Sequence, residues 1–280
     1  MLEIEKISFA YPGHPPALKN VSLAVGEGEF IGLAGRNGSG KTTLTRIMVG
    51  LAKPVAGQVT LDGKAAKSCG PDVMARAIGY VFQNPDRQIF RDTVAQEVAF
   101  GPEQLGWSET ERQDAVTTAL GMTGLESVAA EYPRGLTRSV RQRIAIASAL
   151  ALRPRLLILD EPTSGQDAEE KKQLMELLGG LNRQGIGIIL VTHDMELLLE
   201  HTQRAVVLHR GEKVFDGPTE GLFAGKGHEV AAWGLRIPDA AAVAGLLQAE
   251  TGAVRSVENL AAELGRQLEG KTDENTGAAV

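Results

Sequence analysis

A glycine-rich stretch at residues 35–43 combines the residue types that bind phosphate. It reads Gly-Arg-Asn-Gly-Ser-Gly-Lys-Thr-Thr, which fits the pattern of a glycine, four residues and then Gly-Lys-Ser/Thr. Glycines let successive backbone N–H groups point inward at phosphate oxygens, and the start of a following helix adds positive potential. Lys41 is expected to reach the β- and γ-phosphates of a nucleotide, and the Thr42 hydroxyl to bind Mg²⁺. The alternative is a structural glycine turn, since the chain has 33 glycines.

The neighbouring sequence favours phosphate binding. Residues 30–34 form a short apolar run suited to a buried strand, and apolar residues then recur at helical spacing from Leu44 to Leu51. Strand, glycine loop and helix are the setting that a phosphate-binding loop needs. We therefore predict that nucleotide is bound by Gly35, Arg36, Asn37, Gly38, Ser39, Gly40, Lys41, Thr42 and Thr43.

An acidic pair, Asp160-Glu161, follows a second apolar run at residues 156–159. A carboxylate at the end of such a strand matches the second motif of nucleotide-binding proteins, so Asp160 is predicted to hold Mg²⁺ opposite Thr42. The adjacent Glu161 suits a general base that orients an attacking water. The alternative, an acidic pair that merely ends a strand, is disfavoured by the phosphate-binding loop upstream.

The composition limits the classes of protein that remain. The 280 residues suffice for one large domain with a small appendage, and 43% hydrophobic residues support an ordinary core. The formal net charge of -6 argues against nucleic acid as a partner. Cys69 is the only cysteine, so no disulfide framework or thiolate metal cluster is expected. Neither a signal sequence nor a membrane-spanning stretch is visible, so we expect a cytoplasmic protein whose membrane role comes through a partner.

Two kinds of strand are expected to position the polar residues. Alternating apolar and polar residues predict strands at residues 2–9 and 18–25, and turn residues bound another short strand at residues 57–63. These strands are expected to pair in an antiparallel way. Continuous apolar runs predict buried strands at residues 30–34, 78–82, 156–159 and 187–191, and a closing hairpin at residues 206–215 turns at Arg210-Gly211. Polar residues follow these runs, at the carboxyl ends of strands where parallel sheets bind ligands.

The stretch from residue 84 to about residue 152 lacks strand patterns and carries helical ones. One predicted helix covers residues 108–120, where Ser108 and Glu111 match a capping box. Another covers residues 140–152. A helical insertion between two strands of a parallel sheet is the geometry that this order predicts.

The pattern weakens after residue 225. Two short helices are predicted, at residues 239–250 and 256–268, followed by a disordered tail at residues 272–280. We expect residues 226–280 to form a small C-terminal extension that either packs on the main domain or contacts another subunit.

With these motifs in order, residues 1 to about 220 resemble the ATP-binding cassette (ABC) ATPases. The resemblance implies that Gln83 is the Q-loop glutamine, which contacts Mg²⁺ or water, and that residues 164–167 form the D-loop. It also implies that His193 contacts the γ-phosphate and that Tyr11 stacks on adenine. ATP is then the nucleotide. The catalytic residues implied are Glu161, His193, Lys41 and Gln83, and the Mg²⁺ ligands are Thr42, Gln83 and Asp160.

Within that family the chain is most similar to the ATPases of energy-coupling-factor (ECF) importers, which take up vitamins or cobalt and nickel ions. This similarity lies in residues 80–86 (Tyr-Val-Phe-Gln-Asn-Pro-Asp), Gln88, Ile89, Phe90, Thr93-Val94 and residues 98–102 (Val-Ala-Phe-Gly-Pro). It implies that the region Gln83–Pro102 receives a coupling helix of a transmembrane subunit, and that a separate membrane subunit binds the substrate. The alternative is that Val94, Val98 and Phe100 are only core residues of a helical subdomain.

One family motif is altered. ABC cassettes carry Leu-Ser-Gly-Gly-Gln before a helix, whereas here the motif reads Leu136-Thr137-Arg138-Ser139-Val140. In the family this signature offers N–H groups and a helix N-terminus to the γ-phosphate of ATP held by the opposite subunit. We expect the Arg138 and Ser139 side chains to crowd that approach, although Arg138 could instead add charge as an arginine finger does.

This difference leads to the hypothesis of a heterodimer with one good and one impaired ATP site. The phosphate-binding loop would face the intact signature of a second, different ABC subunit.

The predicted fold is α/β, a P-loop NTPase core of the ABC ATPase type with an antiparallel β subdomain, a helical subdomain near residues 84–152 and a small C-terminal extension. The cassette covers residues 1–225. The predicted function is ATP hydrolysis that drives an ECF-type importer at the cytoplasmic face of the membrane. The alternatives are the ATPase of another ABC transporter, a soluble ABC protein without a transport role, and a subunit that binds ATP without hydrolysing it.

Overall fold

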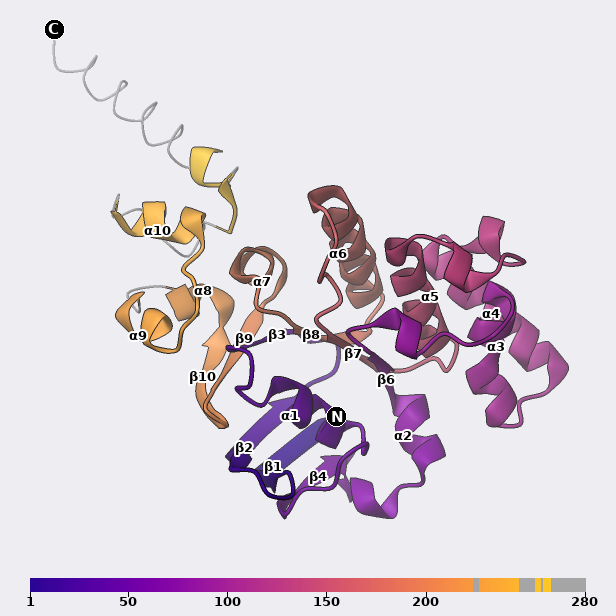
Figure 1. Cartoon of the computed structure of the whole chain (residues 1–280), viewed down its shortest axis with the longest axis horizontal. Helices are drawn as coiled ribbons and strands as arrows, with labels where there is room; N and C mark the ends of the chain where they lie inside the picture. The colour runs from indigo at the N-terminus through magenta and orange to yellow at the C-terminus, as the bar shows by residue number, and fades with distance from the viewer. Residues whose placement is uncertain (224–226, 247–254, 258, 263–280) are drawn as a thin grey trace, which may run out of the picture.

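Two β-sheets form the frame of the molecule (Figure 1). The computed structural model describes residues 1–223, 227–246, 255–257 and 259–262. One sheet is antiparallel, with the strand order β2-β1-β4-β5. The other has the order β10-β9-β3-β8-β7-β6 and is parallel except for the antiparallel pair of β10 with β9.

The strands lie close to the ranges predicted from the sequence. The antiparallel sheet contains β1 (Leu2–Ala10), β2 (Pro16–Val25), β4 (Ala56–Leu61) and β5 (Lys64–Ala65). The parallel sheet contains β3 (Phe30–Ala34), β6 (Ile78–Val81), β7 (Leu156–Asp160), β8 (Gly187–Val191), β9 (Arg204–His209) and β10 (Glu212–Pro218). The predicted turn at Arg210-Gly211 joins β9 to β10 and is confirmed.

The parallel sheet brings the predicted polar residues to one edge. All residues of β3, β7 and β8 are buried, as their unbroken apolar sequences require. Leu33 of β3 and Asp160 of β7 both pair with Val191 of β8, so the three strands end level with one another. The segments that follow these strands therefore start side by side, although they are far apart in the sequence.

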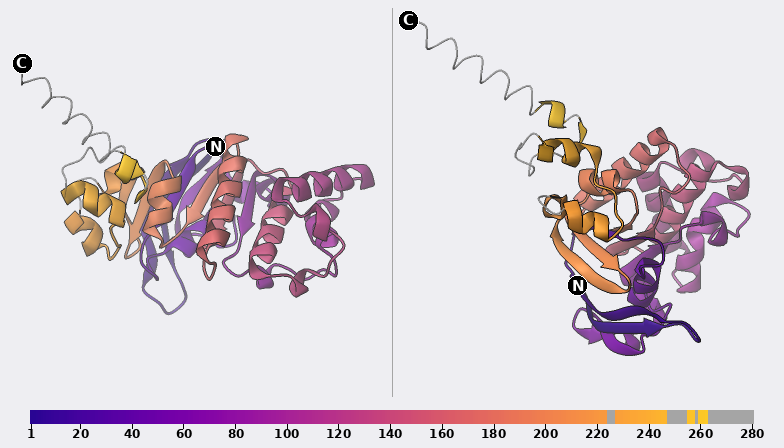
Figure 2. Two further views of the ribbon diagram at one scale, coloured as in Figure 1. Left: turned by 90° about the horizontal axis from the view of Figure 1, so that it is seen from above. Right: turned by 60° about the vertical axis from the view of Figure 1, so that its left-hand side comes forward.

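The helices cover the sheets and extend the molecule at both ends. They are α1 (Lys41–Met48), α2 (Pro71–Ala77), α3 (Val94–Gln104), α4 (Glu109–Thr123), α5 (Arg138–Leu150), α6 (Ala168–Arg183), α7 (Met195–His201), α8 (Thr219–Phe223), α9 (Gly227–Ala232) and α10 (Asp239–Leu246). Short 3₁₀ turns are found at Ala66–Ser68, Pro85–Arg87, Glu126–Val128 and Pro133–Gly135. Figure 2 shows α3–α5 at one end of the molecule and α8–α10 at the other.

The helical group α3–α5 is attached to the β6–β7 side of the parallel sheet. Ile144 and Ile146 of α5 lie in one buried cluster with Leu157 and Leu159 of β7. Each such fully buried aliphatic side chain contributes roughly 1.5–3 kcal/mol to folding. The shared core holds the start of α5 in a defined place relative to the sheet.

Several helix boundaries differ from the predictions. The capping box of Ser108 and Glu111 is confirmed, and α4 continues three residues beyond its predicted end, to Thr123. The helix predicted for residues 140–152 instead begins at Arg138 and ends at Leu150, because the Thr137 side chain caps it. Helices α2, α7, α8 and α9 were not predicted.

The C-terminal predictions are only partly covered by the structure. Helix α10 begins at Asp239 as predicted and is described to Leu246. Residues 247–250 of that predicted helix, most of the helix predicted at residues 256–268 and the tail at residues 272–280 lie outside the described residues.

Candidate nucleotide site

The loop after β3 has the backbone of a phosphate-binding loop. Gly35, Gly38 and Gly40 have positive φ angles of 147°, 80° and 106°. At Gly35 a Cβ atom would lie only 2.5 Å from the Ser39 hydroxyl oxygen, so a larger residue would not fit without a shift. Helix α1 then begins at Lys41, with no side-chain cap from any described residue and no acidic residue in its first turn. Its first N–H groups are available to an anion.

Two buried side chains of this loop lie where phosphate oxygens would be bound. Lys41 is 5% exposed, and its Nζ donates hydrogen bonds to the carbonyl oxygens of Gly35 (2.7 Å) and Arg36 (3.2 Å). Burial lowers the pKa of Lys41, while the charges of Glu161 and Asp160 raise it in part. The buried Ser39 hydroxyl has no hydrogen-bond partner among the described residues. A buried hydroxyl in that condition is costly and suits a bound phosphate oxygen.

Thr42 and Asp160 meet at the same edge of the sheet. The Thr42 hydroxyl donates to Asp160 Oδ1 at 3.2 Å, although 118 residues separate them in the chain. The Tyr80 hydroxyl donates to the second oxygen, Oδ2, at 3.3 Å. Burial raises the pKa of Asp160, and these two hydrogen bonds oppose that rise. Burial beside Asp160 also raises the pKa of Tyr80 to about 12, so Tyr80 stays a donor at neutral pH.

These groups fit Mg²⁺ by the chemistry of their atoms. A threonine hydroxyl and a carboxylate are hard oxygen ligands, and Mg²⁺ is commonly held by one or two such groups together with substrate phosphates. No described group of three or more His, Cys, Asp or Glu residues could hold a metal by itself. Such a pair of ligands therefore depends on phosphate oxygens to complete the coordination.

Glu161 is held in position by three neighbours. Gln83 Nε2 donates to Glu161 Oε2 at 2.9 Å, and the Ser164 hydroxyl donates to the same oxygen at 3.4 Å. His193 Nδ1 lies 3.6 Å from the other oxygen, Oε1. Glu161 itself has a positive φ of 48°, and its N–H bonds to the Val191 carbonyl at 3.0 Å. An unfavourable backbone conformation at a non-glycine residue is typical of functional sites.

Tyr11 lies beside the first turn of α1. Its hydroxyl is 3.2 Å from the Thr43 hydroxyl, and its ring meets Phe9 edge to face at 4.8 Å between centroids. The side chain is 40% exposed, so one part of the ring remains accessible. The structure thus brings Tyr11 to the phosphate-binding loop, while its predicted contact with adenine stays a prediction.

The altered signature lies at the start of α5. The Thr137 hydroxyl accepts the Val140 N–H at 3.4 Å and so caps the helix. The Arg138 guanidinium lies against Gly165 of the predicted D-loop, with Nη1 3.2 Å from where a Cβ of Gly165 would be. In the described part of the chain, no hydrogen bond or ion pair joins residues 136–140 to residues 35–43.

Sequence reasoning missed the role of the Tyr80 hydroxyl. The sequence places Tyr80 in a predicted strand and in the stretch that resembles ECF ATPases, yet its hydroxyl also bonds Asp160 and lies 3.3 Å from Thr45 Oγ1. Its strand β6 pairs with β7, which ends in Asp160. This strand order is what brings the hydroxyl to the carboxylate, and the local sequence does not reveal it.

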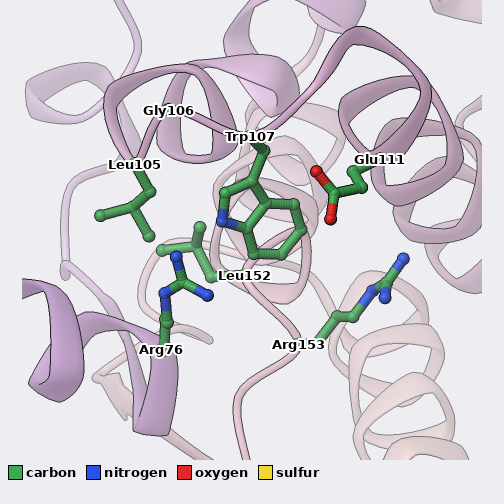
Figure 3. Close-up of a pocket in the computed structure, with 7 residues that line it drawn as sticks. All are labelled: Arg76, Leu105, Gly106, Trp107, Glu111, Leu152 and Arg153. Atoms are coloured by element: carbon green, nitrogen blue, oxygen red, sulfur yellow. The ribbon is translucent and has the colours of Figure 1, made fainter.

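A cavity of about 530 Å³ lies apart from these residues, between the end of α2, the corner from α3 to α4 and the end of α5 (Figure 3). Arg76 and Arg153 each lie over the ring of Trp107, at 5.3 and 5.6 Å from its centroid. The cavity is lined by Arg76, Leu105, Gly106, Trp107, Glu111, Leu152 and Arg153. None of these is a predicted nucleotide-site residue.

The fold and the converging loops define the class of the protein. A family model described as ABC transporter matches residues 18–164. The chain belongs to this family, and the predicted ABC ATPase fold is confirmed.

Individual relatives indicate a narrower group within the ABC transporter family. The chain is 41% identical over 253 residues to the energy-coupling factor transporter ATP-binding protein EcfA2 of Symbiobacterium thermophilum, with 87% of each chain covered. It is 41% identical over 235 residues to an ABC transporter ATP-binding protein of Methanosarcina acetivorans. That match covers 84% of this chain but only 38% of the longer relative.

The structure of CbiO1 from Clostridium perfringens, described as part of the ABC transporter complex CbiONQ, matches with a TM-score of 0.75 and 32% identity. The match covers 87% of this chain and 98% of CbiO1. The predicted resemblance to ECF ATPases is thus confirmed. Of the helices that the structure describes, none is long and apolar enough to cross a membrane.

Proposed function

We propose that the chain is the ATP-binding and ATP-hydrolysing subunit of an ECF-type ABC importer. The observation that carries this proposal is the convergence of Thr42 with Asp160, and of Gln83 and His193 with Glu161, at one edge of the parallel sheet. These side chains lie at or shortly after the carboxyl ends of four different strands, β3, β6, β7 and β8. Their arrangement beside an open phosphate-binding loop suits phosphoryl transfer to water.

Phosphate binding rests on the loop and Lys41. The N–H groups of the loop that have no partner in it would bind the β-phosphate, and Lys41 would exchange a bond to a loop carbonyl for one to a phosphate oxygen. Because burial lowers the pKa of the free amine, bound phosphate charge favours its protonated form. Thr42, Asp160 and Gln83 would hold Mg²⁺, which supplies neutralisation of charge on the β- and γ-phosphates.

Hydrolysis rests on Glu161. Its carboxylate orients the attacking water and accepts a hydrogen bond from it as the water adds to the γ-phosphorus. Gln83 and Ser164 fix one carboxylate oxygen, which leaves Oε1 on the His193 side for the water. His193 is 62% exposed at its side chain and can turn to the γ-phosphate.

A second subunit is part of the proposal. In the family, the signature of the opposite chain completes the contacts to the γ-phosphate. In this chain the motif reads Leu136-Thr137-Arg138-Ser139-Val140. We therefore propose a heterodimer in which a different ABC subunit supplies an intact signature to this chain's phosphate-binding loop. The site formed by residues 136–140 is the impaired one.

The surface Gln83–Pro102 is proposed to receive the transmembrane subunit. Phe90 is 54% exposed and meets Phe100 edge to face at 4.8 Å, and Arg91 lies over both rings. Val94 and Val98 are fully buried beneath and provide a rigid floor. The chain would then act at the cytoplasmic face of the membrane, with a separate membrane subunit binding the substrate.

The proposal is tested by the variant Glu161→Gln in the assembled complex. We expect phosphate release to fall by about 10²–10⁴-fold, while ATP still binds with nearly unchanged affinity. The exposed Glu176 of α6 offers a matched control, and Glu176→Gln should keep the wild-type rate. Hydrolysis that survives in Glu161→Gln, or a wild-type chain that binds no ATP, would contradict the proposed function.

A further inference from the structure

The segment 227–246 contacts the phosphate-binding loop at one point and helix α7 at another. It packs on the strand that carries the phosphate-binding loop, because Val230 and Leu235 share a buried cluster with Ala34, the last residue of β3. Leu198 and Leu199 of α7 belong to the same cluster. Helix α7 begins two residues after His193. One apolar core therefore joins this segment to the elements that carry Lys41 and His193.

The first point of contact is Arg36 on Gly234. Gly234 ends α9 in the left-handed conformation, with φ 71°, and its N–H bonds to the Ala231 carbonyl at 2.9 Å. The Arg36 side chain lies so close that a Cβ atom at Gly234 would overlap its Cδ atom and approach its Nε atom at 2.9 Å. The exposed arginine side chain would have to leave this position to accommodate any larger residue at 234.

The backbone of the same arginine contacts Lys41. The Arg36 carbonyl accepts hydrogen bonds from Lys41 Nζ (3.2 Å) and from the Ser39 N–H (3.0 Å). A displacement of the Arg36 side chain that also moved its backbone would therefore change the direction of Lys41 and the shape of the loop.

The second point of contact is a hydrogen bond between α7 and α10. The Asp239 N–H, at the start of α10, donates to Glu196 Oε1 at 2.8 Å. The first N–H groups of a helix lack partners within it, so Glu196 satisfies one of them from another element. Glu196 lies in the first turn of α7, and the preceding Asp194 caps that helix directly after His193.

We propose that residues 227–246 act as a positioning segment for the ATP site, with Gly234 setting the place of Arg36 and the bond from Asp239 to Glu196 holding the start of α7. The inference rests on the proposed function, since the site must bind ATP for the segment to tune it. Binding and segment docking are then linked, so ATP tightens the docking by the same factor by which docking tightens ATP binding.

The test uses the full chain and the variant Gly234→Ala, with Gly63→Ala as its matched control. Gly63 has nearly the same φ, 74°, but a Cβ there would meet nothing within 4 Å. Both variants therefore share the backbone strain, and only Gly234→Ala displaces Arg36. We expect Gly234→Ala to weaken the binding of a fluorescent ATP analogue by about fivefold or more. Gly63→Ala should stay within about twofold of the wild type.

A double substitution separates positioning from general damage. Adding Arg36→Ala to Gly234→Ala removes the side chain that is displaced, so the double variant should bind ATP no more weakly than Arg36→Ala alone. Equal affinities for Gly234→Ala and Gly63→Ala, or effects of the two substitutions that simply add, would overturn the inference. A wild-type chain without ATP binding would remove the proposed function and this inference with it.

Hydrogen exchange in the wild-type chain gives a second measurement that does not depend on a variant folding. ATP should slow exchange of the Leu235 and Asp239 amides, which bond to Val230 and Glu196, by about fivefold or more. Exchange of these amides that ATP leaves unchanged would overturn the inference, even where ATP binding itself is normal.

Discussion

The starts of helices α1 and α5 are built in opposite ways. Helix α1 begins after Gly40, and within the described residues no side chain caps it, so its N–H groups stay open to a ligand. Helix α5 begins after Thr137, whose hydroxyl takes up the Val140 N–H within the chain. Both helix starts lie in motifs that meet phosphate in the ABC family, but only the second has one of its first donors, the Val140 N–H, bonded to a capping side chain of the described residues.

The uncapped start of α1 is suited to binding a ligand, whereas the capped start of α5 is stabilised without one. An open helix start leaves unpaired donors and gains most when an anion arrives, whereas a capped start is already stable. Near α1 the chain also has a buried lysine, a buried carboxylate and a serine hydroxyl without a partner among the residues that the structure describes. The start of α5 instead carries the Arg138 and Ser139 side chains in the place of glycines. In the proposed heterodimer, the chain would hold one half of an ATP site ready and would offer a poor second half.

Restoring glycines at the start of α5 should produce the largest change. The double variant Arg138→Gly, Ser139→Gly lets the backbone approach a phosphate, so we expect phosphate release by the purified chain at high concentration to rise at least about tenfold. The rate would be measured over a range of protein concentrations, because the gain requires pairs of this chain.

The matched control is Arg138→Ala, Ser139→Ala, which removes the same crowding but keeps a Cβ atom at both positions. If this control matches the glycine variant, side-chain bulk alone is responsible. A purified chain that already hydrolyses ATP strongly, with no change in either variant, would remove the contrast between the two helix starts.

Much of the site could be predicted because its residues are fixed by local spacing. The pattern at residues 35–43 demands a loop between a strand and a helix, and the structure has that order. The contact of Thr42 with Asp160 follows from topology, because parallel strands that carry polar residues at their carboxyl ends bring them to a common edge.

Other features could not be read from the sequence because they depend on tertiary packing. The arginine at position 138 could crowd a phosphate or contact it, and only the coordinates place it against Gly165. Helices α2, α7 and α9 are seven, seven and six residues long, too short for a clear helical period. Nothing local links Gly234 to Arg36, since about 200 residues separate them.

Removing the cap of α5 should have a moderate effect on stability. Thr137→Ala leaves the Val140 N–H without its side-chain acceptor, so the free energy of unfolding should fall by about 1 kcal/mol. Thr117→Ala, on an exposed position within α4, is the control and should be neutral or slightly stabilising. Denaturant unfolding of both variants measures the difference. Equal stabilities of the two variants would show that the Thr137 cap does not stabilise the start of α5.

A substitution of Asp160, beside the uncapped start of α1, is expected to raise the free energy of unfolding rather than lower it. Burial raises the pKa of Asp160 above its ordinary value of about 4, so the ionised carboxylate costs stability at neutral pH. Asp160→Asn removes that charge. We expect the ATP-free variant to be more stable than the wild type by about 0.5–1 kcal/mol, while Mg²⁺-dependent hydrolysis is lost.

The pH dependence of this gain identifies its cause. Well below a pH of about 4 the carboxyl group is protonated in both the folded and the unfolded chain, so its contribution no longer differs between the two states. The unfolded chain ionises first as the pH rises, so the wild type loses stability relative to the variant between the ordinary pKa and the raised folded-state pKa. The stability difference should therefore be largest near pH 7 and shrink toward zero as the pH falls well below about 4. If Asp160→Asn stabilised the fold equally at neutral and at acidic pH, the charge of Asp160 would not be the cause of the lower stability of the wild type.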